Sequence, residues 1–253
     1  MALDEALMAE LPLSRTPVLR LYRWRTPCLS VGYFQSVARD IDLERCRVAG
    51  VAVVRRPTGG RAILHRWELS YSLAALETDP LFTGGVLRSY ARVSRGLVAA
   101  MGFLGVAAQA IPPRRQTGTD SSPACFDAIA GYEVAVEGKK LVGSAQVRRG
   151  GVVLQQGTIL LRSEPEALFY LLRYPDEGSR MEAQEKYCRW VTSLEQMLGD
   201  ALSFPRLLAA TRHGLSEGLG VQLAPGRLTA EERAAARRLV KEKYSRPEWN
   251  LRR

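Results

Sequence analysis

Histidine and cysteine are scarce in this sequence of 253 residues. Its two histidines are His65 and His213, and its four cysteines are Cys28, Cys46, Cys125 and Cys188. No two cysteines form a Cys-x-x-Cys pair, and no histidine lies near any of them along the chain. Zinc sites in proteins need such clusters of ligands. The sequence therefore predicts no metal centre.

Long apolar runs are missing as well. The N-terminal segment carries Asp4, Glu5 and Glu10 where a secretory signal would need an apolar stretch. The longest uncharged run, residues 96–113, is rich in Ala and Gly and ends in two prolines, which is typical of a soluble helix and the loop after it. We therefore expect a cytoplasmic protein with reduced thiols and no membrane partner.

Acidic residues are outnumbered by basic ones, 26 against 36, which gives a net charge of +10. The excess gathers in residues 227–253, with nine basic and four acidic residues, and in residues 55–66, with four arginines and no acid. Such a charge favours an acidic partner, either nucleic acid or an acidic surface. The sequence shows neither a basic helix-turn-helix nor an aromatic stacking platform, so nucleic acid is the less favoured partner.

Hydrophobic periodicity and turn residues predict an α+β protein. Strands are expected at 18–22, 28–34, 51–55 and 68–73, and helices at 1–10, 40–49 and 86–101. Pro12 should stop the first helix, Asp40 should cap the second, and Gly102 should end the third.

Three further runs, at 132–136, 140–147 and 152–161, are joined by Glu137-Gly138 and by Arg149-Gly150-Gly151, which predicts an antiparallel meander. Helices follow from 162 onward, and Thr229 with Glu232 forms a capping box for a helix at 231–244. We expect one α+β domain over residues 1–253, with mostly antiparallel sheets covered by helices and a helical C-terminal segment from about residue 195.

The first candidate site is the loop Arg55-Arg56-Pro57-Thr58-Gly59-Gly60-Arg61. Paired glycines let backbone N–H groups approach a ligand closely, and arginines offer forked donors to a carbonyl, carboxylate or phosphate. A tight turn with solvated arginines explains the same residues, and composition alone does not choose between the two. Neither the GxGxxG nor the GxxxxGK[ST] nucleotide motif is present.

Cys125 is the second candidate, because a loop is where a reactive thiol is normally presented. The other three cysteines lie in an apolar strand or in helices, where a cysteine usually acts as a small buried hydrophobe. Lys140 is the third candidate. A lysine at the start of a strand ordinarily faces solvent, but the small residues Gly143, Ser144 and Ala145 that follow it indicate close approach by a ligand or by another backbone.

These three segments occur in one order and together resemble a known family. Residues 55–65, Cys125-Phe126-Asp127 and residues 137–146 are similar to the biotin/lipoate ligase and octanoyltransferase superfamily. Residues 1–6, 30–35, 155–160 and 244–250 extend the resemblance over nearly the whole chain. It is strongest to the LipM-type octanoyltransferase branch. Members of the family usually carry a strand before the helix with which this chain opens, and its absence here suggests either a late start codon or a lost edge strand.

The resemblance implies a biotin/lipoate-ligase-like catalytic domain and an acyltransferase activity without ATP or metal. An octanoyl group would pass from acyl carrier protein, through a cysteine thioester, to a lysine of the glycine cleavage H protein or of a lipoyl domain. Cys125 matches the nucleophile, and Lys140 matches the lysine that lowers the pKa of that thiol. The residues matching the substrate site are Arg56, Thr58, Gly59, Gly60, Arg61, His65, Gly143, Ser144, Ala145 and Gln146.

Two alternatives remain within the resemblance. One is an ATP-dependent lipoate–protein ligase, and the other is an amidotransferase that moves octanoyl from the H protein to lipoyl domains. Ligases tend to have a third glycine where Arg61 stands and to lack a cysteine at position 125, which favours the transferase. A non-enzymatic basic binding protein is the alternative from another class. With the resemblance, the charge of +10 is expected to form a docking surface for the acidic carrier and acceptor proteins.

Overall fold

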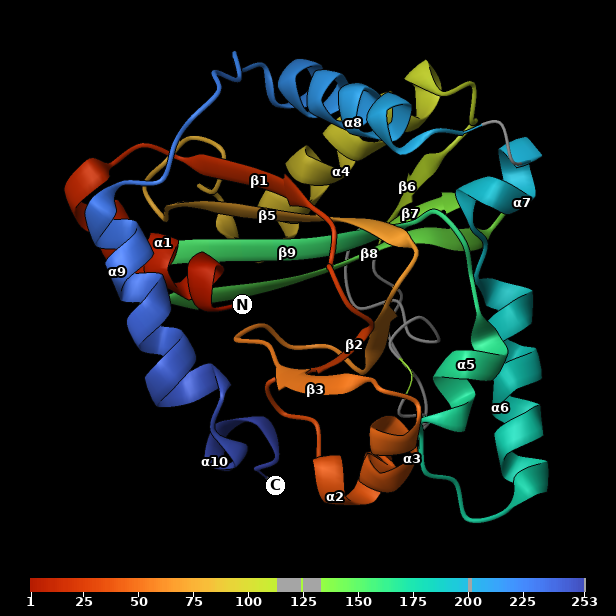
Figure 1. Ribbon diagram of the computed structural model, residues 1–253. Helices are drawn as coiled ribbons and strands as arrows, with labels where there is room; N and C mark the ends of the chain where they lie inside the picture. Colours follow the sequence, from red (N-terminus) through yellow and green to blue (C-terminus); the bar gives the residue numbers. More distant parts are fainter. Residues whose placement is uncertain (113–123, 125–132, 200–201, 253) are drawn as a thin grey trace.

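The computed structural model describes residues 1–112, 124, 133–199 and 202–252, and two β-sheets form its centre (Figure 1). The larger sheet is antiparallel throughout, in the order β1-β5-β9-β8-β7-β6. Its strands are β1 (Val18–Tyr22), β5 (Glu68–Leu76), β6 (Gln109–Ile111), β7 (Glu133–Val136), β8 (Lys139–Arg149) and β9 (Val152–Leu160). β7, β8 and β9 form the predicted meander.

The smaller sheet has the order β3-β2-β4, from β2 (Cys28–Val31), β3 (Ala52–Arg55) and β4 (Ile63–His65). β2 runs parallel to β3 and antiparallel to β4. The loop between β3 and β4 contains the Thr58-Gly59-Gly60 sequence. The smaller sheet therefore positions the first candidate site, the loop at residues 55–61, beside the larger sheet.

Helices cover both sides of the larger sheet. α4 (Gly85–Phe103) and α8 (Phe204–Leu219) pack against each other on one face, and α1 (Ala2–Ser14) with α9 (Ala230–Leu239) lies across the other (Figure 1). The remaining helical segments are α2 (Val37–Asp40), α3 (Leu43–Val48), α5 (Pro165–Tyr170), α6 (Glu177–Trp190), α7 (Leu194–Leu198), the π-helix η3 (Val240–Tyr244) and α10 (Pro247–Asn250). Over the part of the chain that the structure describes, no helix has the length and apolar character needed to cross a membrane.

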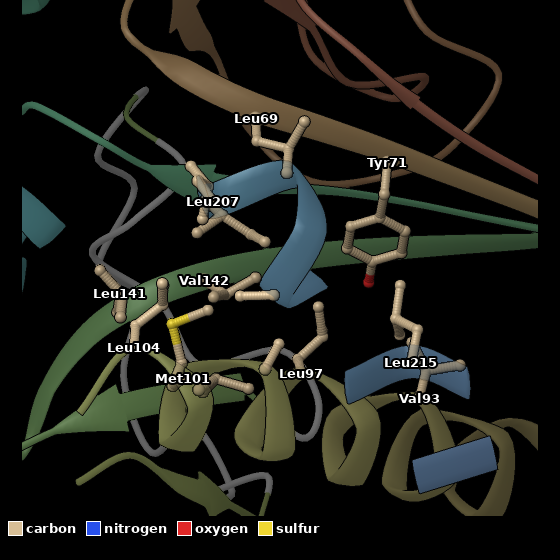
Figure 2. Packing of buried hydrophobic residues seen from close by; sticks show 14 of the residues in the cluster. Leu69, Tyr71, Val93, Leu97, Met101, Leu104, Leu141, Val142, Leu207 and Leu215 are labelled. Carbon is tan, nitrogen blue, oxygen red and sulfur yellow. The ribbon is translucent and has the colours of Figure 1, made fainter. Parts of the chain in front are cut away.

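The largest hydrophobic cluster lies between the larger sheet and the α4–α8 pair. Leu69 and Tyr71 of β5 and Val142 of β8 lie on the side of Leu97 of α4, and Leu141 lies beside Leu104 (Figure 2). The two helices can approach closely because residue 214 is a glycine. A Cβ atom at Gly214 would lie only 2.2 Å from the backbone nitrogen of Ala100. With both faces covered, β5 is buried along almost its whole length. The strand predicted at 68–73 is longer in the structure and ends at Leu76.

Two predicted helix boundaries are wrong. α1 continues through Pro12 to Ser14, because a proline this near the C-terminal end removes only one hydrogen bond from the helix. The single helix expected at 40–49 is two short helices, α2 and α3. Asp42, not Asp40, caps α3 by accepting from the Arg45 backbone N–H at 3.0 Å. Ile41 between the two helices is extended and fully buried.

The other predicted elements are confirmed with adjusted ends. The strand expected at 28–34 stops at Val31, and the helix expected at 86–101 runs past Gly102 to Phe103. The capping box at Thr229 is present, with Glu232 and Thr229 each bonding the other's backbone N–H. The fold is an α+β fold in which strand pairing is mostly antiparallel, with a fully antiparallel larger sheet and a mixed smaller one, covered by helices as expected.

Candidate active site

A narrow cavity between the two sheets brings together six of the residues predicted to bind substrate. Its volume is about 30 Å³, room for about two water molecules. The smaller sheet and its loop contribute Arg56, Thr58, Ile63 and His65, and the larger sheet contributes Ser70, Gly143, Ser144, Ala145, Gln156, Gly157 and Thr158, with Met1 and Tyr22 completing the wall. A longer ligand would have to widen this cavity.

Backbone contacts fix the glycine loop against the turn after β2. The Tyr33 N–H donates to the Thr58 carbonyl at 2.9 Å. A Cβ atom at Gly32 would lie 1.7 Å from the Gly60 carbonyl oxygen, so only glycine permits this approach. Gly60 itself has a φ of 90°, which favours glycine for its own conformation. The two glycines therefore set the shape of the loop.

Two arginines of the loop, Arg55 and Arg56, are buried and bind the protein itself, whereas Arg61 is half-buried. The Arg56 guanidinium donates to the Gly59 carbonyl at 3.0 Å, to the Arg61 carbonyl at 2.7 Å and to the Ser30 carbonyl at 2.9 Å. Its side chain thereby holds both ends of the Gly59-Gly60 turn. The interpretation of a turn with solvated arginines is wrong for Arg56.

Arg55 is fully buried and ties the loop to the C-terminal end of the chain. Its guanidinium donates to the carbonyls of Gly32, Gln35 and Trp249 at 2.7, 2.8 and 3.1 Å. The Trp249 indole N–H in turn donates to the Arg55 carbonyl at 3.1 Å. Arg55 therefore anchors the loop to the C-terminal end of the chain. Its guanidinium, which the sequence offered as a donor to a ligand, donates to carbonyls of the protein instead.

His65 belongs to a hydrogen-bonded chain that ends on Arg56. The His65 Nδ1 atom lies 3.2 Å from a Glu68 carboxylate oxygen, and Nε2 lies 2.7 Å from the Ser30 hydroxyl. That hydroxyl accepts from Arg56 at 2.8 Å. Because a carboxylate only accepts, the proton of the neutral imidazole sits on Nδ1 and the Ser30 hydroxyl donates to Nε2.

Burial keeps the imidazole neutral. It lowers the pKa of His65 below its usual 6.5, and this outweighs the opposing effect of the Glu68 carboxylate. The Trp24 ring stacks on the imidazole with 4.3 Å between ring centroids. His65 thus lines the cavity as an oriented, neutral side chain.

Lys140, at the start of β8, is buried and ion-paired. Its Nζ atom bonds a carboxylate oxygen of Glu133 in the neighbouring strand β7, and both side chains are under a tenth exposed. The Lys140 carbonyl accepts from the Thr192 N–H at 3.0 Å. The ordinary expectation that a strand-opening lysine faces solvent is therefore wrong at this position.

Glu133, the partner of the candidate residue Lys140, was not predicted from the sequence. The Glu137-Gly138 turn folds β7 back on β8, and the register shifts between Val134 and Ala135. A carboxylate in an otherwise apolar strand, diagonal to a lysine across a predicted hairpin, is the signal that could have identified it. Lys140 lies three residues before Gly143, which lines the cavity.

Ser144 and Gln146 lead from the site into a polar network under α4. The Ser144 hydroxyl lies 2.6 Å from the Tyr71 hydroxyl, and the Gln155 amide donates to Tyr71 at 3.1 Å. The Gln146 amide donates to Gln155 at 3.0 Å and to Ser89 at 3.1 Å. Gln146 does not line the narrow cavity, but it lines a second, larger hollow together with Gly59.

The candidate nucleophile Cys125 lies outside the described residues. Ala124, which precedes it in the chain, is fully buried and pairs in a parallel bridge with Ala62, directly after the glycine loop. Among the described cysteines, burial raises the pKa of Cys28 to about 12 and of Cys46 to about 11. Cys188 is exposed, and its pKa is also raised. None of these three has the lowered pKa that marks a reactive thiol.

The fold and the sequence are both similar to those of lipoyl protein ligase catalytic domains. Residues 1–215 match the family of lipoyl protein ligase A/B catalytic domains. The chain belongs to this family.

Particular relatives are similar over the full length. The chain is 45% identical to the octanoyltransferase LipM of Kyrpidia tusciae and 42% identical to that of Symbiobacterium thermophilum, covering all of this chain and 93% of each relative. Among solved structures, a bipartite lipoate protein ligase of Thermoplasma acidophilum matches with a TM-score of 0.83 and 25% identity, over 99% of this chain and 89% of that one.

Proposed function

We propose that this protein is an octanoyltransferase that uses Cys125 as nucleophile and Lys140 as its supporting cation. The observation that carries the activity is the full-length similarity, at 45% identity, to a protein named octanoyltransferase LipM. The buried Lys140 at the start of β8 supports the assignment of the site. Burying an ammonium costs desolvation free energy, and such buried charged groups cluster at functional sites.

The reaction runs in two acyl transfers. The Cys125 thiolate attacks the carbonyl carbon of an octanoyl thioester, a new C–S bond forms, and the carrier thiolate leaves and takes a proton. A neutral lysine amine of the acceptor then attacks the carbonyl carbon of the enzyme thioester. The C–N bond forms, the amine nitrogen gives one proton to solvent, the C–S bond breaks, and the Cys125 thiolate is released. The first step exchanges thioesters of similar energy, and the amide product drives the second.

Lys140 and the adjacent backbone supply the electrostatics of both steps. A nearby ammonium favours the thiolate over the thiol and stabilises charge that develops on the carbonyl oxygen. Glu133 holds the Lys140 Nζ atom in place. The backbone from Gly143 to Ala145 and the Arg56-held glycine loop then bound the space for the acyl chain.

The donor is acyl carrier protein, and the acceptor is the glycine cleavage H protein or a lipoyl domain. Residues 227–253, with nine basic and four acidic residues, supply a surface complementary to such acidic proteins. Arg237 and Arg238 on α9 are exposed. These charges accelerate encounter more than they strengthen binding, so the rate of transfer should fall with added salt.

Transfer assays distinguish the octanoyltransferase activity from the two alternative activities, that of an ATP-dependent ligase and that of an amidotransferase. The protein is incubated with octanoyl carrier protein and apo H protein, without ATP, and octanoylation of the H protein is followed by mass. Transfer without ATP supports the transferase. Activity only with free octanoate or lipoate and ATP would assign the protein to the ligases. Transfer only from octanoyl H protein to a lipoyl domain would make it an amidotransferase.

A further inference from the structure

A second hollow, much larger than the narrow cavity, opens beside it. Its volume is about 670 Å³. The residues that border it come from α1, from the turn after β2, from the glycine loop, from the β8–β9 hairpin and from the C-terminal segment, among them Met8, Tyr33, Phe34, Arg149, Lys243 and Trp249. We refer to this hollow as the hairpin groove.

The hairpin groove continues from the narrow cavity. Thr58 and Ala145 line the cavity, and their neighbours in the chain, Gly59 and Gln146, line the groove. The two hollows therefore meet across these two pairs of residues. A ligand whose reactive end lies at the cavity can extend into the groove.

The groove follows the edge of β8. Residues 146–150 line it consecutively, whereas a strand face would present only every second residue. Pairing with β7 ends at Val142, so residues 143–149 pair with β9 on one side and, among the described residues, with no strand on the other. Such an edge offers N–H and C=O groups to an extended ligand that carries amides.

The groove has apolar walls and a positive rim. Arg149 is exposed, and no side-chain hydrogen bond or ion pair connects it to another described residue. Lys243 is paired with Glu5 at 2.6 Å and lies 3.7 Å from the centre of the Trp249 ring. Arg252 stacks on Tyr33 and Trp249 at 4.2 Å from each centre. Arg149 is thus an available forked donor for an anion, within a positive surrounding.

We propose that the hairpin groove binds the phosphopantetheine arm of the octanoyl donor, with Arg149 contacting its phosphodiester. This inference rests on the proposed transferase function. The arm has a phosphodiester at one end, two amides along its length and the thioester at the other end. These groups match, in order, the Arg149 guanidinium, the open edge of β8 and the narrow cavity where the acyl chain enters.

The lengths agree. From Ala145, at the cavity, to Arg149 is four residues of strand, or about 13 Å at the usual rise per residue. Roughly thirteen bonds separate phosphorus from sulfur in the arm, and at the reach of an extended backbone this gives about 15 Å. The phosphodiester can therefore reach Arg149 while the thioester lies at the cavity mouth.

Two donors test the groove. Octanoyl-phosphopantetheine and octanoyl-pantetheine carry the same thioester and the same two amides, but only the first carries the phosphate. We expect kcat/KM for acylation of the protein to be about tenfold or more higher with the phosphorylated donor, the usual size of one charged hydrogen-bonded contact. In Arg149→Ala this preference should largely disappear, and in Arg149→Glu it should invert.

Arg212→Ala on α8 is the matched control, because it removes one exposed arginine outside the groove and should leave the donor preference unchanged. An equal kcat/KM for both donors in the unaltered protein, or an unchanged preference in Arg149→Ala, would overturn the proposal. ATP that inhibits as strongly as unacylated phosphopantetheine would assign the groove to a nucleotide instead. If neither donor acylates the protein, the transferase function itself fails, and that result is distinct from a lost preference.

Discussion

The two sheets hold their buried cations in opposite ways. In the larger sheet, the Lys140 ammonium is paired with the Glu133 carboxylate across a hairpin. In the smaller sheet, the Arg55 and Arg56 guanidinium groups donate to backbone carbonyls, some in distant parts of the chain and some within the glycine loop itself. Arg55 and Arg56 therefore shape the glycine loop, whereas Lys140 places a compact positive charge at the start of β8. Removing each kind of cation should have a different consequence.

The largest effect is expected at the buried ion pair. Lys140→Met leaves Glu133 buried without this partner and should lower the free energy of unfolding by about 3–5 kcal/mol. The double variant Lys140→Met/Glu133→Leu should recover most of that loss, because a buried pair can be replaced by apolar residues at little cost. Its acylation rate at neutral pH should nevertheless stay at least about tenfold low, which corresponds to one pKa unit of the thiol. Denaturant unfolding and thioester formation measure the two quantities, and recovery of both would remove Lys140 from the chemistry.

Replacing Arg55 should lower the free energy of unfolding and loosen the C-terminal end of the chain. Arg55→Met leaves several buried carbonyls without their donor and should lower the free energy of unfolding by about 3 kcal/mol or more. The segment 244–252 should then be cleaved faster in limited proteolysis, since Arg55 bonds the Trp249 and Arg252 carbonyls. Arg47→Met is a matched control, because Arg47 is exposed and pairs only locally with Glu44. Equal stability of the two variants would contradict the anchoring role.

Two glycines near the loop test how its shape is fixed. In Gly32→Ala the new methyl group would collide with the Gly60 carbonyl, which should cost about 2 kcal/mol of unfolding free energy. Gly59→Ala is the matched comparison, because nothing lies within 4 Å of a Cβ atom there. Thermal unfolding should separate the two clearly. Similar melting temperatures would show that the loop is not held by the Gly32–Gly60 approach.

The smallest effect concerns pH. Burial lowers the pKa of His65, so below its usual 6.5 the unfolded chain binds a proton that the folded protein does not. The free energy of unfolding should therefore fall as pH decreases below about 6.5, by at most about 1.4 kcal/mol per pH unit for this one proton. His65→Gln should flatten that part of the profile. A profile with the same slope in both proteins would place the titrating group elsewhere.

Local signals in the sequence predicted much of the fold. The β7–β9 meander follows from two glycine-containing turns between β-rich runs, and the α9 start follows from the Thr229 capping box. Where two local signals compete, the prediction failed. One helix was expected over 40–49 with its cap at Asp40, but Asp42 caps α3, and the extended, buried Ile41 separates α2 from α3.

The site could be predicted only in part. The Arg-Gly loop and the Lys140 strand were identified from their residues, and the structure brings six of those residues to one cavity. The partners were not predictable, because they depend on contacts between distant segments: Arg55 bonds residues almost two hundred positions away, and Lys140 bonds a carboxylate across a hairpin with a register shift. Such pairs exist only once the sheets have formed.

The central claim is that Cys125 carries the octanoyl group. The protein is mixed with octanoyl carrier protein without ATP, digested and examined by peptide mass, alongside Cys125→Ala and Cys188→Ala. The account predicts one added octanoyl group on the peptide that contains Cys125, retained in Cys188→Ala and lost together with transfer to the H protein in Cys125→Ala. Undiminished transfer by Cys125→Ala, or an adduct on another residue, would contradict it.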